Sequence, residues 1–206
     1  GEWARGAAED LWAGRGQAET DEAYFRRPLL RRIVEAAQSV VVHNPAAARR
    51  VREASPEAPP VVEIPHYVEP APAFSSEEIA TVRRSLDVPD GALLIGCFGY
   101  QRPPRRLRTV LRAAARLCSP WRLLVVGEFV SAAYEASLSD LLAAPGAIRR
   151  PYAPEDEFRR LAAAVDVCVN LRWPSAGETS GIAMRLMAAG KPVVVTDSEE
   201  WAATPE

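Results

Sequence analysis

Short continuous apolar runs recur along the chain, and segments with helical spacing of apolar residues separate them. Such runs are typical of strands that a parallel sheet buries on both faces. Strands are predicted at residues 39–44, 61–64, 93–99, 121–127, around 148, at 167–171 and at 193–195. From Leu93 onward strand and helix alternate, which predicts an α/β fold with a parallel sheet and helices on both of its faces.

The stretch from Val165 to Asp197 has the clearest organisation. A strand at 167–171 runs into a polar loop, and Ser180 is the predicted N-cap of a helix that starts at Gly181. This helix is apolar almost all round, so we expect it to be buried, and Gly190 ends it. The loop lies at the carboxyl edge of the sheet, where ligands bind and where free helix amides favour an anion.

The first seventy residues are predicted to form a separate region. Residues 1–37 suit helices that lie on a larger body, with Arg26, Arg27, Arg31 and Arg32 as a solvated helix face. Asn44 caps a predicted helix that has Pro45 at its first position, and the proline-rich segment 68–74 precedes a new helix with a serine cap. We therefore expect one domain at 1–70 and another at 71–206.

A second loop places several cations at a predicted helix start. The helix is expected from Arg105 to about Leu117, and Arg102, Arg105 and Arg106 surround its first turn, where positive charge opposes the helix dipole. A bound anion would turn this unfavourable interaction into a favourable one. The simpler interpretation is that exposed arginines tolerate the unfavourable interaction with the dipole. Carboxyl-edge loops at 99–106, 127–128 and 170–181 are expected to converge and to hold a diphosphate.

Glu178 adds a carboxylate to the third of these loops. A carboxylate repels phosphate, so we expect Glu178 to contact neutral hydroxyls such as those of a sugar. The alternative is a solvated residue that stabilises the helix start.

Composition limits the chemistry that the chain can perform. The 206 residues carry a formal charge of −2 and are 48% apolar, which allows a real core and argues against general nucleic-acid binding. Three cysteines, Cys97, Cys118 and Cys168, lie in or beside apolar runs and are expected to be reduced core residues. His43 and His66 are the only histidines, so a metal cluster or a serine-histidine triad is not expected. No apolar run reaches membrane-spanning length, which predicts a cytoplasmic protein.

Five segments resemble one enzyme family. LLIGCFGYQRPPRRL, WRLLVVGE and, above all, VCVNLRWPSAGETSGIAMRLMAAGKPVVVTD resemble the C-terminal domain of the retaining glycosyltransferases of family four. SVVVHNPAAARRVRE and VVEIPHYV resemble the end of the N-terminal domain and the interdomain connection of that family. The resemblance covers about residues 38–200 and implies the GT-B fold of two Rossmann-like domains, incomplete here at both ends. The chain starts at Gly1 and has only Met184 and Met187, so we expect a fragment.

The resemblance also implies the reaction. A hexose would pass from a UDP-, GDP- or ADP-sugar to a glycan, lipid or small-molecule acceptor, with retained anomeric configuration and without a metal or other cofactor. Such an enzyme belongs to glycan biosynthesis of bacterial type, with no nucleic-acid partner, and any contact with a membrane surface would be left to the missing domain. This fragment alone would bind the donor and turn over poorly.

Residue by residue, the family pattern matches incompletely. Arg105 is expected to stabilise the departing diphosphate, and Glu178 to act on the sugar, as the two catalytic residues. The donor-binding residues predicted are Gly99, Arg102, Arg105, Arg106, Glu128, Gly177, Thr179, Ser180, Gly181 and Arg185. The two family glutamates, eight positions apart, fall at Gly177 and Arg185, so Glu178 is displaced by one. Arg185 would pair with Glu178, reach a phosphate or satisfy a buried acid elsewhere.

Alternative functions remain open on the sequence. A regulatory or degenerate sugar-nucleotide-binding module would account for Arg185. A Rossmann oxidoreductase is disfavoured because Gly96 and Gly99 do not make a G-x-G-x-x-G turn. A phosphorylase-like enzyme would need a Schiff-base lysine, and Lys191, the only lysine, lies in a tight turn.

Overall fold

The chain forms two units, each with its own internal contacts. The computed structural model describes residues 31–175 and 177–202. The first unit ends at Tyr67 but also includes Pro174–Thr179 and the residues from Asp197 onward, and the second comprises Val68–Trp173 and Ser180–Thr196. The sequence predicted a boundary near residue 70, but not that two later segments would group with the first unit.

The first unit contains a two-stranded parallel sheet. Its elements are α3 (Arg31–Ala36), β1 (Val40–Val42), α4 (Pro45–Ala54), β2 (Val61–Glu63) and the short η2 (Glu199–Trp201). Val40 lies opposite Val61 and Val42 opposite Glu63. As predicted, Asn44 caps α4, and Ala46 and Ala48 are buried. Arg31 and Arg32 are exposed, and the predicted helix face around Arg26 and Arg27 lies outside the described residues.

The second unit is built on a five-stranded sheet in which all pairs are parallel. Its strands are β3 (Leu93–Phe98), β4 (Trp121–Val126), β5 (Ala147–Arg150), β6 (Val167–Asn170) and β7 (Val193–Val195), in the spatial order β5-β4-β3-β6-β7. The predicted α/β, Rossmann-like architecture is confirmed.

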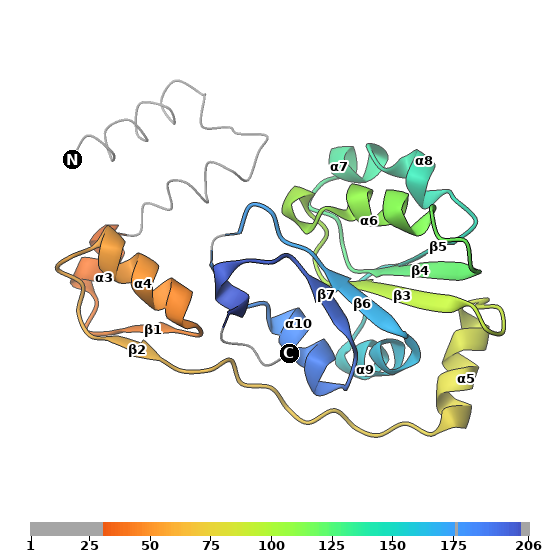
Figure 1. Cartoon of the computed structure of the whole chain (residues 1–206), viewed down its shortest axis with the longest axis horizontal. Helices are drawn as coiled ribbons and strands as arrows, with labels where there is room; N and C mark the ends of the chain where they lie inside the picture. The colour runs from red at the N-terminus through yellow and green to blue at the C-terminus, as the bar shows by residue number, and fades with distance from the viewer. Residues whose placement is uncertain (1–30, 176, 203–206) are drawn as a thin grey trace. The chain divides into compact units, whose positions relative to one another are not determined.

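Helices cover both faces of this sheet (Figure 1). One face carries α5 (Ser76–Ser85), α9 (Glu155–Ala164) and α10 (Gly181–Ala188), and the other α6 (Leu107–Ala114), α7 (Ala132–Ala136) and α8 (Ser139–Leu142). Along β3, Leu94 and Phe98 join the first core cluster, whereas Ile95 and Cys97 join the second. The period of two follows from strand geometry, and it explains why β3 reads as a continuous apolar run.

Three sequence predictions about this unit were wrong in detail. The helix expected from Arg105 is a 3-10 turn, η1 (Pro103–Arg105), followed by α6 from Leu107. The single helix that the alternation implies between the strands at 121–127 and 148 is instead two short helices, α7 and α8. In α10 only Ala183 and Leu186 are fully buried, so it is not buried all round, because it packs against the core on one side.

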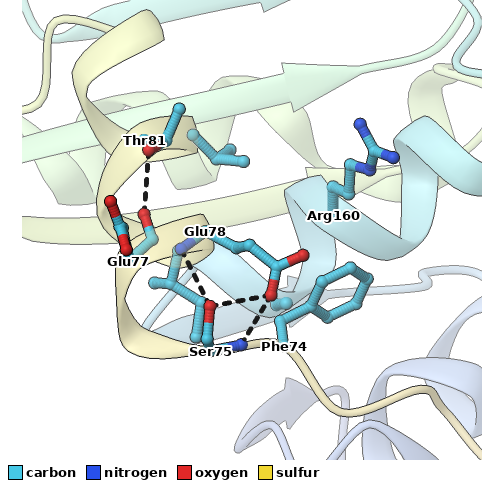
Figure 2. Close-up of a pocket in the computed structure, with 9 residues that line it drawn as sticks. Phe74, Ser75, Glu77, Glu78, Thr81 and Arg160 are labelled. Atoms are coloured by element: carbon cyan, nitrogen blue, oxygen red, sulfur yellow. Dashed lines mark hydrogen bonds between the residues drawn. The ribbon is translucent and has the colours of Figure 1, made fainter.

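A pocket of about 380 Å³ lies between α5 and α9. Phe74, Val82 and Ala163 contribute apolar surface to it, and Arg160 extends from α9 (Figure 2). At its edge the N-terminus of α5 is closed by a capping box, in which the backbone nitrogen of Ser75 donates to Glu78 Oε2 (2.8 Å) and that of Glu78 to Ser75 Oγ (3.2 Å). None of the predicted donor-binding residues lines this pocket.

Candidate functional site

The strand order of the second unit identifies the position where a ligand is expected. From β3 the chain proceeds outward to β4 and β5, then returns to the other side of β3 with β6 and β7. The order therefore reverses between β3 and β6, and the loops after these strands lead to helices on opposite faces of the sheet, α6 and α10. In open α/β sheets, such a switch point is the place where ligands bind.

Gly99, the residue after β3, lies at the centre of this edge. It has φ +99°, and a Cβ atom on it would stand 3.2 Å from Arg105 Nη2 and 3.3 Å from Ile182 Cγ1. The guanidinium of Arg105 and the first turn of α10 therefore face the same glycine. The structure brings these two predicted elements together.

Gly127, the residue after β4, approaches the same point. It has φ +129°, and a Cβ on it would stand only 2.2 Å from the carbonyl oxygen of Gly99. The loops after β3 and β6 are also joined directly, because the backbone nitrogen of Trp173 donates to the carbonyl of Pro104 (2.8 Å). The predicted convergence of the carboxyl-edge loops is thus present for the parts that belong to the second unit.

Ser180 organises the start of α10. It is fully buried, and its Oγ accepts from the backbone nitrogen of Ala183 (3.3 Å), as an N-cap does, while it donates to Asn170 Oδ1 (3.0 Å). Helix geometry leaves the amides of Gly181 and Ile182 without an acceptor inside α10. These amides are suited to bind an anion.

Arg172 is a residue that sequence reasoning missed. Its Nη2 donates to Ser180 Oγ (3.1 Å), and its backbone nitrogen donates to Thr196 Oγ1 (2.9 Å). A second guanidinium therefore lies at the N-terminus of α10. The available signal was its place two residues after β6, in the loop already predicted to bind an anion.

The other two predicted arginines occupy the ends of η1. Arg102 is its half-buried N-cap residue, and Arg106 is the exposed residue between η1 and α6 with φ 55°. Because α6 begins at Leu107, Arg105 and Arg106 precede the helix instead of occupying its first turn. The dipole of α6 therefore acts on guanidinium groups beside the helix start and not within its first turn.

Glu128 is exposed and supports a neighbouring loop. Its Oε1 accepts from the backbone nitrogen of Tyr152 (3.1 Å), just after β5. This contact holds the β5–α9 loop against the β4 loop. A direct contact of Glu128 with a donor stays a prediction.

Arg185 pairs with a residue that the sequence did not identify. Its Nη2 donates to both carboxylate oxygens of Glu155 (2.7 and 2.6 Å), and its guanidinium lies 4.0 Å from the ring centroid of Phe158. Arg159 also donates to Glu155 (2.7 Å), so one carboxylate serves two cations. These bonds lower the pKa of Glu155, mainly through Arg159. Of the partners predicted for Arg185, the structure shows an acid elsewhere, and that acid is half-exposed.

Gly177, Glu178 and Thr179 belong to the first unit. Gly177 is buried with φ +85°, and a Cβ on it would stand 2.6 Å from Arg50 Nη1. Asn44 Nδ2 donates to the Gly177 carbonyl and to Thr179 Oγ1, both at 2.9 Å. Glu178, half-buried, lies between these two residues. The role of this segment toward a sugar stays a prediction.

The cysteines agree with the sequence prediction at two positions of three. Cys97 and Cys168 are buried, and burial raises the pKa of each thiol to about 12, which keeps both protonated at neutral pH. Cys118, expected in the core, is exposed because it lies in the turn between α6 and β4. Within residues 31–175 and 177–202, no three His, Cys, Asp or Glu residues are grouped as a metal site, and no helix is long and apolar enough to span a membrane.

Solved structures share this fold. HepE of Anabaena in complex with UDP-glucose superposes with a TM-score of 0.73 at 16% identity, over 91% of this chain and 52% of that one. Sucrose-phosphate synthase of Thermosynechococcus elongatus gives 0.65 at 20% identity, over 90% and 47%. WaaG, a glycosyltransferase of lipopolysaccharide biosynthesis, gives 0.64 at 18% identity, over 79% and 45%. The chain therefore spans about half the length of the structures it matches.

The family is shown by a match at the level of sequence. No match is found among curated proteins. The family model described as "Glycosyl transferases group 1" matches residues 92–205, which is more than half of the chain and includes all five strands of the second unit. The chain belongs to the group 1 glycosyltransferases, and its second unit has the Rossmann-like fold of a GT-B domain.

Proposed function

We propose that the second unit binds the diphosphate of a nucleotide-sugar and that the full-length protein is a retaining glycosyltransferase, which transfers a hexose to a glycan, lipid or small-molecule acceptor. The single observation that carries this proposal is the arrangement at Gly99, where a Cβ atom would lie 3.2 Å from Arg105 Nη2 and 3.3 Å from the side chain of Ile182, in the first turn of α10. Cationic side chains and free helix amides are the two groups that bind phosphate most effectively.

The charges around the site fit a diphosphate. Arg172 lies at the start of α10, Arg105 faces Gly99, and Arg102 and Arg106 flank η1. A nucleoside diphosphate gains negative charge as the sugar departs, so fixed guanidinium groups stabilise the transition state more than the bound donor. We propose that these arginines supply the countercharge without a metal ion. We propose uracil, guanine or adenine as the donor base, and titration with UDP, GDP and ADP distinguishes among the three.

Glu178 is proposed to hold the sugar. It precedes the N-cap Ser180 by two residues, so the chain itself keeps it close to the start of α10. Because its carboxylate would repel phosphate, it is suited to accept hydrogen bonds from sugar hydroxyls. In this proposal the acceptor attacks the anomeric carbon from the side on which the phosphate leaves.

The proposal is tested by measuring sugar transfer with the full-length protein and its variants. Glu178→Gln and Arg105→Ala are expected to lower kcat strongly while the proteins stay folded. Arg112→Ala is the matched control, because Arg112 is an exposed arginine in the last turn of α6. Unchanged transfer by both site variants would remove these residues from the site.

A second candidate is a sugar-nucleotide-binding module without turnover. Arg185 stands at the place of the second family glutamate, and its guanidinium already pairs with Glu155 and stacks on Phe158. This observation favours a module that binds the donor without transferring the sugar. Donor binding by the full-length protein without transfer to any acceptor would support it.

A further inference from the structure

Asn44 uses all of its side-chain hydrogen-bonding atoms in two different tasks. It is 5% exposed, and its Oδ1 accepts from the backbone nitrogen of Ala47 (2.8 Å), which caps α4. Its Nδ2 donates to the carbonyl of Gly177 and to Thr179 Oγ1, both at 2.9 Å. The cap sets the orientation of the carboxamide, and the carboxamide then holds a segment more than 130 residues away in the sequence.

The two acceptors flank a single residue, Glu178. Further bonds hold the segment before it, because the backbone nitrogen of Gly177 donates to Ser175 Oγ (3.0 Å) and Ser175 in turn donates to the buried Glu200. Residues 175, 177 and 179 are thus bonded within the first unit. One buried amide therefore holds the main chain just before Glu178 and the side chain of the residue just after it.

The choice of residue agrees with this double task. Asp, Ser, Thr and Asn all cap helices, because each has a side-chain oxygen that accepts from a backbone amide. Of these four, only Asn combines that acceptor with an N–H₂ group that donates twice. A cap alone does not require an amide, whereas a cap that also holds two acceptors does.

We propose that Asn44 is a positioning residue for sugar transfer, which holds the residues on either side of Glu178 so that its carboxylate meets the donor sugar in one orientation. This inference rests on the proposed function, in which Glu178 contacts the sugar. The inference gives the N-cap of α4 a role in the reaction, whereas the sequence resemblance placed this segment only at the end of the N-terminal domain. A displacement of about 1 Å of a group that orients a substrate can lower a rate by about a hundredfold.

Two substitutions separate the bonds from Asn44 to Gly177 and Thr179 from its role as the cap of α4. Asn44→Asp and Asn44→Ser both keep an oxygen for the Ala47 amide, but neither has the N–H₂ group. With the full-length protein, both variants are expected to lower kcat by about 10- to 100-fold. The KM for the donor is expected to change less than threefold, since the proposed diphosphate contacts lie elsewhere. Ser131→Ala, which removes the cap of α7, is the control that loses a cap and keeps kcat.

The dependence on Glu178 is tested with double variants. If Asn44 acts through Glu178, Asn44→Asp in the Glu178→Gln background adds no further loss of kcat. Multiplied losses would mean that Asn44 acts independently of Glu178, and normal kcat in both single variants would equally overturn the inference. If the wild-type protein transfers no sugar, the proposed function fails, and this role fails with it.

Discussion

Replacement of Gly99 by alanine tests the closeness of the loops at the carboxyl edge. At φ +99° an L-residue is strained by about 1–2 kcal/mol, which lowers Tm by roughly 2–8 °C in a chain of this size. The new Cβ would stand 3.2 Å from Arg105 Nη2 and 3.3 Å from Ile182 Cγ1, so both side chains must move by a few tenths of an ångström. If the displaced guanidinium loses part of its charged hydrogen bond to the diphosphate, the binding free energy falls by about 1 kcal/mol. A nucleoside diphosphate then binds roughly fivefold more weakly.

Two other glycines provide the controls for this measurement. Gly91 also has positive φ, +72°, but a Cβ there meets nothing within 4 Å, so Gly91→Ala is expected to lower Tm and leave the affinity unchanged. In Gly127→Ala the Cβ would stand 2.2 Å from a backbone oxygen, and backbone cannot yield as a side chain does, so we expect the largest loss of Tm. Calorimetric titration and thermal unfolding measure both quantities. Equal affinities of the Gly99→Ala and Gly91→Ala proteins would refute the reasoning.

Three further outcomes are expected from other contacts. The bonds to Arg159 and Arg185 lower the pKa of Glu155 in the folded state, so the stability that Glu155 contributes is present above its unfolded pKa and is lost as pH falls through its folded pKa. Glu155→Gln should therefore make the decline of Tm between about pH 5 and pH 3 less steep. An unchanged slope would contradict this. The Arg185→Met side chain should still pack on the Phe158 ring, but the free energy of unfolding should fall less steeply than in the wild type over the same pH range. Chemical denaturation measures this dependence. Ser75→Ala, which opens the capping box of α5, should cost about 1 kcal/mol in urea unfolding, whereas Ser76→Ala should cost much less, and equal losses would argue against the cap.

Local patterns predicted much of the fold. Strand positions followed from continuous apolar runs, and the start of α10 followed from Ser180, whose Oγ caps the helix as expected. The spatial order of the strands could not be predicted, since parallel pairing joins distant segments. The helix predicted from Arg105 was wrong because Pro103 and Pro104 form a 3-10 turn and Arg106 then adopts φ 55°, which interrupts the helix.

The parts of the site that depend on long-range contacts were not predictable. Nothing near Arg185 in the sequence points to Glu155, thirty residues earlier, and nothing near Asn44 points to Gly177. Both pairs arise only when the chain folds. In contrast, the position of Gly99 and Arg105 at the carboxyl edge was predictable, because Gly99 directly follows β3 and Arg105 lies in the same loop.

The grip of Arg105 and the α10 amides on a diphosphate is the central claim, and direct binding measures it. The 206-residue chain is titrated calorimetrically with UDP, GDP, ADP and inorganic pyrophosphate, as wild type, Arg105→Ala and Arg112→Ala. We predict that at least one nucleoside diphosphate binds the wild type and the Arg112→Ala protein equally, and that Arg105→Ala weakens it by about tenfold or more, the value of one charged hydrogen bond. Equal affinity of the Arg105→Ala protein for that ligand, or no binding of any diphosphate by the wild type, would contradict the account.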